Sequence, residues 1–427
     1  MLLGTVAAAS ADVVNVSPAG DDVRGDGSAV RPFASLQRAL DYAAALPKND
    51  TLFIRVGGGE YRLCDPVRIT PDNSGTAAAP VVIEGAGMDA TVFRGSVTFG
   101  GFERYDDKVW RVRVPRECRG GFEQIYVGGE RRFRAQLPDR GGFLEMERVD
   151  EFVIDSSATN RTGKNWAVLK VTLDGGTASR LGRMPRSEWN DAIFNFYHKW
   201  DVTRLRLQYL DAAQGEAYFV EEGMMQWNPI DVKSRLVVEN CSAALDSAGE
   251  WYFDRSGGWL YYIPVDGENP ETLEVSVPVV EKFLEITGDE ALGRRAGHVI
   301  LRDLSFREAG YGTPAFGNAA AQAAAPIEAA VMADYAEGVV LERCEVAHTG
   351  LGGSMVPPCM PQFSPAAVPP ARSGGERRQD RRDGYADIGY GHAPYYGRQL
   401  DHTAWRLCLP VCRGGGYIPR IGQQRDA

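Results

Sequence analysis

Two segments of the chain repeat one pattern of apolar and polar positions. Residues 298–310 read HVILRDLSFREAG, and residues 338–350 read GVVLERCEVAHTG. In both segments apolar and polar residues alternate, the alternation slips by one residue near Asp303 or Arg343, and it then resumes. A period of two indicates a β-strand, so the slip predicts two short strands joined by a tight bend. The inward apolar positions match in four pairs: Val299 with Val339, Leu301 with Leu341, Leu304 with Cys344, and Phe306 with Val346.

Repeated strand–bend–strand units are typical of a β-solenoid, in which successive coils stack their inward faces. Residues 329–336 can supply a strand of the coil between the two copies. Residues 32–46 predict an amphipathic helix that carries Leu36, Ala39, Leu40 and Ala43 on one face. We expect this helix to cover the open end of the first coil, which would otherwise expose core and strand edges.

The pattern changes between residues 119 and 270. Aromatic residues become dense there, and hairpin signals replace the coil spacing. Residues 250–264 read EWYFDRSGGWLYYIP, which predicts a β-hairpin with its turn at residues 256–258. Residues 198–207 predict a buried strand with Arg204 and Arg206 on its solvent face. We interpret residues 119–270 as an inserted antiparallel β domain.

Composition narrows the classes of partner and the compartment. The chain has 427 residues, of which 49 are glycine, and a formal net charge of −10, which argues against nucleic acid or an anionic membrane as partner. No stretch approaches the ~20 apolar residues of a membrane span. Residues 1–11 end in Ala9-Ser10-Ala11 and resemble the back half of a secretory signal, so we expect a secreted or periplasmic protein. The seven irregularly spaced cysteines predict no metal site, and we expect no cofactor.

Several of these segments together resemble right-handed parallel β-helix glycoside hydrolases, most closely the group around family 141, which includes fucosidase- and xylanase-type enzymes. The resemblance covers residues 12–350 and rests on VSPAGDD with RPFASLQRAL, FEQIYVGGERRFRAQLPD, GEWYFDRSGGWLYYIP, QAAAPIEA and LERCEVAHTG. It implies a carbohydrate substrate and hydrolysis by two acidic residues. We therefore expect an all-β fold, a right-handed parallel β-helix (solenoid) with an N-terminal capping helix and an inserted antiparallel β domain. The expected parts are a partial signal peptide (1–11), cap and first coils (12–118), the inserted domain (119–270), further coils (271–350) and a tail (351–427).

The tail does not continue the coil pattern. It is rich in Pro, Arg, Gly and Ala and contains no lysine, which is typical of a disordered, low-complexity segment. Codon degeneracy permits a second interpretation. Read one base later, residues 372–382 can encode DLGASGVKIGE and residues 410–426 can encode PSAVGVGIFHASANNEM, and both strings look like further coils of this family. We therefore hypothesise a one-base frameshift near codon 351, which would leave the chain truncated and inactive as given.

Candidate catalytic residues must be carboxylates that project from stacked coils, because glycoside hydrolysis uses an acid and a nucleophile or base. The coils offer Asp303, Glu308, Glu328, Asp334, Glu345 and His348, and each could equally be an ordinary solvated residue. We favour Glu345 and His348 at a strand end and turn, and Glu328 in the family-like stretch. Trp189 and Trp200 are the candidate sugar-binding platforms, because aromatic faces stack on sugar rings.

Two other functions remain open at this point. A non-catalytic carbohydrate-binding β-helix would show an aromatic strip without paired carboxylates. A polysaccharide lyase would show an Arg or Lys base beside a Ca²⁺ site. The expected partner in each case is a polysaccharide or oligosaccharide, and we expect a monomer. A solenoid that ended at residue 350 would expose apolar faces such as those of Val339, Leu341 and Val346.

Overall fold

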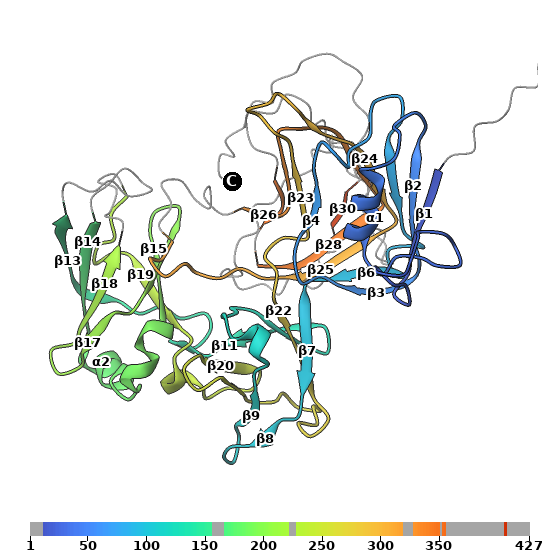
Figure 1. Ribbon diagram of the computed structural model, residues 1–427. Helices are drawn as coiled ribbons and strands as arrows, with labels where there is room; N and C mark the ends of the chain where they lie inside the picture. Colours follow the sequence, from blue (N-terminus) through green and yellow to red (C-terminus); the bar gives the residue numbers. More distant parts are fainter. Residues whose placement is uncertain are drawn as a thin grey trace, which may run out of the picture.

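The computed structural model describes residues 12–155, 166–221, 228–318, 328–350, 352–355 and 405–407. These residues are mostly β-strand, which confirms the expected all-β class. They form a body of three sheets and an inserted part that leaves this body and returns to it (Figure 1). The signal-peptide prediction for residues 1–11 and the frameshift hypothesis for residues 351–427 fall on segments that lie outside the described residues, apart from two short strands.

Three sheets of mainly parallel strands build the body. The first sheet contains β1 (Asp12–Val16), β2 (Leu52–Val56), β5 (Val81–Glu84), β24 (Ala296–Arg302) and β27 (Ala336–Glu342). The second contains β3 (Gly59–Arg62), β6 (Thr91–Arg94), β25 (Ser305–Ala309), β28 (Cys344–Thr349) and β30 (Trp405–Leu407), the last of which is antiparallel. The third contains β4 (Val67–Ile69), β23 (Leu284–Thr287), β26 (Ala329–Asp334) and β29 (Gly352–Met355). The chain visits the first, second and third sheets in turn, so each circuit adds one strand to each sheet.

The two repeated segments stack on each other as predicted. Val299 pairs with Val339 and Leu301 with Leu341 between β24 and β27. Phe306 pairs with Val346 between β25 and β28. The predicted slip is a bend at one residue, because Asp303 and Arg343 adopt left-handed φ angles of 58° and 50°. The expectation that Val339, Leu341 and Val346 are exposed is wrong, because they are 7%, 4% and 2% exposed within the body's core.

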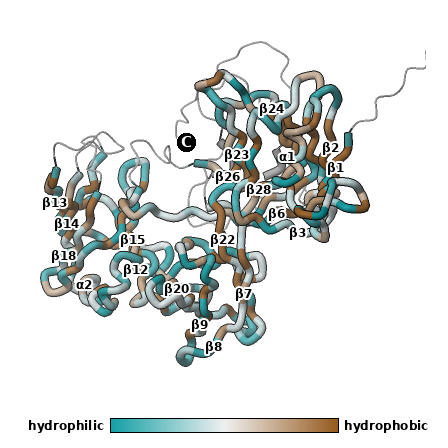
Figure 2. The backbone as a smooth tube through the Cα atoms, viewed as in Figure 1, coloured by the Kyte–Doolittle hydropathy of each residue, from teal (hydrophilic) through white to brown (hydrophobic). Residues whose placement is uncertain are grey.

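Helix α1 (Leu36–Ala43) packs against the first strands of the body. The Ser35 side chain caps it by accepting the Arg38 backbone N–H. Its buried residues are the four predicted from the periodicity, namely Leu36, Ala39, Leu40 and Ala43. They belong to the same apolar core as strands β1, β2 and β4. Figure 2 shows the corresponding hydrophobic positions along β1 and β2.

The inserted part begins with β7 (Ser96–Gly100) directly after β6 and ends with β22 (Glu274–Pro278) before β23. These strands pair in an eight-stranded sheet of order β7-β22-β10-β11-β20-β21-β9-β8. The other members are β8 (Glu103–Arg104), β9 (Trp110–Arg113), β10 (Ile125–Val127), β11 (Glu130–Arg134), β20 (Glu250–Asp254) and β21 (Trp259–Tyr262). The predicted hairpin is confirmed as β20 and β21. The sheet contains residues on both sides of residues 119 and 270, and those domain boundaries stay predictions.

The far end of the inserted part consists of two four-stranded antiparallel sheets around a separate apolar core. One contains β12 (Gln136–Leu137), β19 (Arg235–Glu239), β15 (Ile193–Tyr197) and β16 (Val202–Arg206). The other contains β13 (Met146–Asp155), β14 (Trp166–Leu173), β18 (Glu216–Glu221) and β17 (Tyr209–Asp211). We call this pair of sheets the sandwich. Helix α2 (Gly175–Leu181) follows β14, and short 3₁₀ turns lie at Arg116–Cys118, Arg186–Asp191 and Ser242–Ala244.

One buried carboxyl should make the stability of the sandwich depend on pH. Glu221 at the end of β18 is 1% exposed, its Oε1 has no hydrogen-bond partner within the described residues, and burial raises its pKa to about 8. A raised pKa means that the folded state holds the proton over a window in which the unfolded state has lost it. Stability is therefore fully present at the acidic side of this window and is lost as the pH rises through it.

We expect the Glu221→Gln variant to remove this pH dependence. In the wild type, the free energy of unfolding should fall by about 1.4 kcal/mol per pH unit because of Glu221, or by about 3 kcal/mol between about pH 5 and about pH 7.5. This fall should be absent from the variant. Urea unfolding at both pH values measures it. Glu216→Gln is the control, because Glu216 is partly exposed beside Lys170 and its pKa is lowered, chiefly by the Lys170 hydrogen bond. Equal slopes in wild type and Glu221→Gln would contradict the assignment.

Candidate functional site

The inserted part leaves the body at the corner between the second and third sheets. We call residues 94–96, 278–282, 308–313, 328 and 348–350 the insert corner. In one circuit, the chain passes this corner by way of the whole inserted part, which lies between β6 and β23. In the next circuit, the chain passes the corner by way of the loop that follows β25, and it returns to the body at Glu328, directly before β26. Part of that loop, residues 311–318, extends from the body to the sandwich (Figure 1).

The start of this loop is fixed by side chains of the inserted part and the body. The backbone N–H groups of three consecutive residues each donate to a side chain: Tyr311 to Gln124 (2.9 Å), Gly312 to Glu281 (3.1 Å) and Thr313 to Glu123 (2.6 Å). The Gln124 side chain also donates to the Tyr311 carbonyl at 3.2 Å. The loop is therefore held at the junction between the two parts by specific polar contacts.

Two carboxylates lie on successive circuits at this corner. The register of β23 with β26 pairs Leu284 with Val331, and Phe283 donates its backbone N–H to the Ala330 carbonyl. Continuing that register by two residues places Glu281 level with Glu328. Both residues shortly precede these paired strands, whose backbones lie about 4.8 Å apart where they pair. The sequence analysis named Glu328 and missed Glu281.

The two carboxylates differ in their surroundings. Glu328 forms an ion pair with Lys282, and its side chain is 53% exposed. Glu281 is exposed and accepts the Gly312 N–H, and no cation pairs with it within the described part of the chain. Burial lowers the pKa of Lys282, but its hydrogen bonds to Glu328 and Glu285 outweigh burial and raise it. Lys282 thus remains a cation beside Glu328.

Glu308 and His348 occupy equivalent positions on successive circuits, because their neighbours Arg307 and Ala347 pair in register. Both residues have left-handed backbones, with φ angles of 67° and 55°. Glu308 is 2% exposed, and its carboxylate accepts hydrogen bonds from Arg94 (2.6 Å), Ser276 (2.9 Å) and Ser96. Since Ser96 lies in β7 and Ser276 lies in β22, the first and last strands of the inserted part, Glu308 ties those strands to the body.

Tyr126 connects the inserted part to the next circuit. Its hydroxyl donates to the His348 carbonyl at 2.9 Å, and the two rings meet edge to face with centroids 5.1 Å apart. Burial raises the pKa of Tyr126 to about 12, so its hydroxyl remains a donor at neutral pH. The contact places the His348 turn against strand β10.

A cluster of buried charges lies where the loop meets the sandwich. Glu123 contacts Arg204 at 2.6 Å, Arg134 at 3.4 Å and Arg206 at 3.6 Å. Glu239 completes the cluster at 3.3 Å from Arg204. Burial would raise the pKa of Glu123, but the charges of Arg204 and Arg134 outweigh burial and lower it. These five residues, which we call the arginine cluster, hold the loop against β16.

The prediction that Arg204 and Arg206 face solvent is wrong. Their side chains are 14% and 6% exposed. Arg204 donates to the Thr313 hydroxyl at 3.0 Å, and Arg206 donates to the carbonyls of Thr313 and Pro314. The alternation of the strand was interpreted correctly, but the outward side of β16 is covered by a loop that arrives from the body. The sequence pattern of β16 alone cannot show that a distant loop covers this side of the strand.

The structure places the five predicted site residues in different surroundings. Glu328 and His348 lie at the insert corner. Glu345 lies along the second sheet, level with Ser305, and forms an ion pair with Arg307. Trp189 and Trp200 lie at opposite ends of β15, Trp189 half-buried and Trp200 43% exposed. Glu328 and His348 thus lie at the same corner on successive circuits, the other three lie elsewhere, and all five roles stay predictions.

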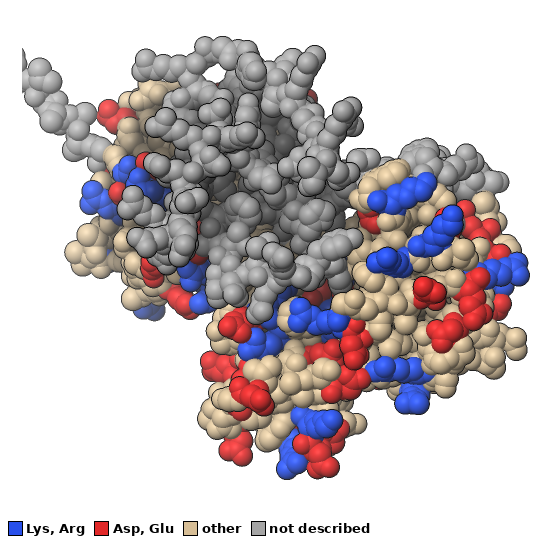
Figure 3. Space-filling model, turned by 180° about the vertical axis from the view of Figure 1, so that it is seen from behind, with Lys and Arg blue, Asp and Glu red and all other residues tan. Residues whose placement is uncertain are grey.

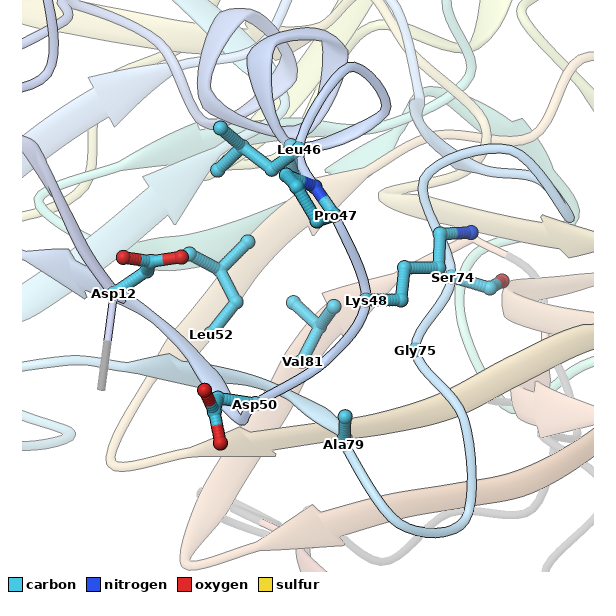
Figure 4. A pocket seen from close by; sticks show the side chains of 11 residues that line it. Asp12, Leu46, Pro47, Lys48, Asp50, Leu52, Ser74, Gly75, Ala79 and Val81 are labelled. Atoms are coloured by element: carbon cyan, nitrogen blue, oxygen red, sulfur yellow. The ribbon is translucent and has the colours of Figure 1, made fainter. Parts of the chain in front are cut away.

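Other features of the described residues add no second candidate for catalysis. No group of three His, Cys, Asp or Glu residues that could hold a metal ion is present in them. None of their helices has the length and hydropathy needed to cross a membrane. A small hollow beside the loop between α1 and β2 is lined by Asp12, Lys48 and Asp50 among mainly apolar residues (Figure 4). Lys48 there donates to the Pro71 carbonyl at 3.1 Å.

Comparison with known proteins identifies the fold rather than the family. No protein family matches the chain, and no curated protein matches it. A solved structure described as "Glycoside hydrolase" matches with a TM-score of 0.64 and 24% sequence identity, over 81% of this chain and 63% of that chain. A solved complex of XylC with xylose matches with a TM-score of 0.36 and 12% identity, over 80% of this chain and 41% of that chain, which is too low to support an inference.

The first of these similarities shows that the chain has the fold of a glycoside hydrolase. The chain spans about 63% of the length of that solved structure. The likeness shows the fold alone, so activity, substrate and partners are matters for proposal.

Proposed function

We propose that the chain is a glycoside hydrolase-like protein that acts on a polysaccharide at the insert corner. The observation that carries the proposal is the position of Glu281 and Glu328 on successive circuits, at the corner from which the inserted part leaves. The shared fold with a glycoside hydrolase supports the class. The three sheets of stacked strands support a right-handed parallel β-helix as the body. Membership of the group around family 141, secretion and a monomeric state are parts of the same proposal.

The two carboxylates suggest a division of roles. Glu328, paired with Lys282, is the anionic partner that would attack the sugar. Glu281 accepts a backbone N–H and forms no ion pair within the described residues. It is the acid that would protonate the leaving oxygen. Carboxyl groups about 5–5.5 Å apart act with retention of configuration, and larger separations of about 6.5–9.5 Å leave room for a water and give inversion. Backbones about 4.8 Å apart allow either carboxyl separation for two flexible glutamate side chains, and we propose retention as the version to test.

The test is hydrolysis of a panel of neutral polysaccharides and their oligosaccharides. We expect new reducing ends, and proton NMR of the first product should show the anomer of the substrate. Products with unsaturated ends would indicate a lyase instead. Absence of any product from folded preparations of both the chain as given and the chain with a restored frame would count against hydrolysis.

The frameshift is a separate proposal that the gene sequence tests. The bases after codon 350, read one base later, should encode the strings that continue the coil pattern. If they do, the protein expressed from the restored frame should hydrolyse the substrate at least about tenfold faster than the chain as given, since it would include the further coils. Bases that cannot encode those strings would end the hypothesis and leave the proposal for the insert corner unchanged.

A further inference from the structure

The outer face of one sheet of the sandwich is unusually rich in aromatic side chains. In β14, Trp166, Val168, Lys170 and Thr172 are partly exposed, and the residues between them are buried in the sandwich core. The register extends this outer face across four strands. Val168 pairs with Phe152 and Val220, and Lys170 pairs with Asp150 and Tyr218, which in turn pairs with Tyr209. We call Phe152, Trp166, Tyr209 and Tyr218 the aromatic face.

The rings of this face are accessible and partly in contact with one another. Phe152 is 52% exposed and Tyr209 is 46% exposed. The Tyr209 and Tyr218 ring centroids lie 5.7 Å apart. Trp189 meets Tyr209 edge to face at 5.6 Å, so Trp189 extends the face at one side. Isolated apolar residues on a surface are ordinary, whereas several rings on one sheet face, with Val168 and Val220 between them, form an apolar surface of the kind that marks a binding site.

The charges on this face are paired with one another. Asp150 contacts Arg148 at 2.8 Å and Lys170 at 3.6 Å, and Lys170 contacts Glu216 at 2.8 Å. The Tyr218 hydroxyl donates to Glu216. Both cations are thus occupied by carboxylates and do not favour an anionic ligand. In Figure 3, acidic and basic side chains are interspersed over the visible part of the molecule, without a large area of one sign.

We propose that the aromatic face binds a neutral polysaccharide chain, at a site distinct from the insert corner. Rings present flat apolar surfaces to the C–H faces of sugar rings, and the adjacent ion-paired side chains offer donors and acceptors to hydroxyl groups. The face lies on the sandwich, and the insert corner lies on the body (Figure 1). The surface would hold the polymer while the corner acts on it, but binding does not depend on hydrolysis.

Affinity electrophoresis of the full chain tests the proposal. The Glu328→Gln chain is run through gels that contain neutral xylan, mannan or β-glucan, so that binding is measured whether or not the protein is a hydrolase. We expect retardation by at least one neutral polymer. Tyr209→Ala should weaken that binding about tenfold, a loss typical of one stacked ring. Tyr209→Phe should keep it, because the ring remains.

Two controls separate this result from misfolding and from other ligands. Val232→Ala removes an apolar side chain, 50% exposed, from another part of the inserted region and should leave binding unchanged. Thermal unfolding should be the same for Tyr209→Ala and Tyr209→Phe to within the small change that a surface residue causes. Unchanged binding by Tyr209→Ala overturns the proposal. So does retardation only by anionic polymers, or self-association through this face without any binding of polysaccharide.

Discussion

Replacing Glu123 with Gln should lower the free energy of unfolding by about 3–5 kcal/mol, because it removes one partner of a buried ion pair and leaves the others uncompensated. Glu123 contacts Arg204 at 2.6 Å, and its carboxylate also accepts the backbone N–H and the hydroxyl of Thr313. With the charge removed, Arg134 and Arg204 would keep Glu239 as their ion-pair partner, and Arg206 would lose its contact with Glu123. Urea unfolding followed by tryptophan fluorescence measures the loss.

A matched exposed pair provides the control for this prediction. Arg343 and Asp303 also form a close ion pair, at 2.7 Å, but their side chains are 48% and 25% exposed. Exposed pairs typically contribute less than about 1 kcal/mol, so Asp303→Asn should have only a small effect. Equal small losses for Glu123→Gln and Asp303→Asn would mean that the arginine cluster does not hold the loop against the sandwich.

The second large effect concerns catalysis. Glu328→Gln should lower the rate of hydrolysis at least about 10³-fold on every substrate, because an amide cannot act as the attacking carboxylate. Glu281→Gln should lose about 10²–10⁴-fold on natural glycosides, which need a proton at the leaving oxygen. On aryl glycosides with a good leaving group, its first step should stay fast and appear as a burst of released phenol, because that step does not need the proton, whereas hydrolysis of the glycosyl-enzyme still lacks its base. This difference distinguishes a lost acid from general damage to the site.

Glu345→Gln is the control for both variants. Glu345 carries the same side chain on the same body, but it lies along the second sheet and pairs with Arg307. We expect its hydrolysis rate to stay within about threefold of wild type, because the substitution changes a partly buried ion pair away from the insert corner. A loss as large as that of Glu328→Gln would move the site away from the insert corner and onto the second sheet.

Features set by neighbouring residues could be predicted from the sequence. The buried side of α1 follows from a period of 3.6, and all four of its predicted residues are buried. The stacked pairs of β24 with β27 follow from a period of two and its single slip. The β20–β21 hairpin follows from a glycine turn between aromatic runs.

Features set by distant parts of the chain could not be predicted in this way. Glu281 follows a strand of the inserted part, and its partner Glu328 lies one circuit later, beyond a loop. No periodicity links the two positions. Arg204 and Arg206 alternate as solvent-facing residues should, yet a loop from the body covers them. The aromatic face was missed for a related reason, since Phe152 and Tyr209 become neighbours of one surface only through two intervening strands.

The most direct test of the hydrolase proposal is covalent labelling of the nucleophile. The protein is incubated with an activated 2-deoxy-2-fluoro glycoside of the sugar that it releases, and the labelled peptide is identified by mass spectrometry. A retaining enzyme accumulates the glycosyl-enzyme intermediate under these conditions. We predict a label on Glu328 that is absent from the Glu328→Gln variant. A label on another residue, or steady hydrolysis without any label, would contradict the assignment of the insert corner as the site of a retaining reaction.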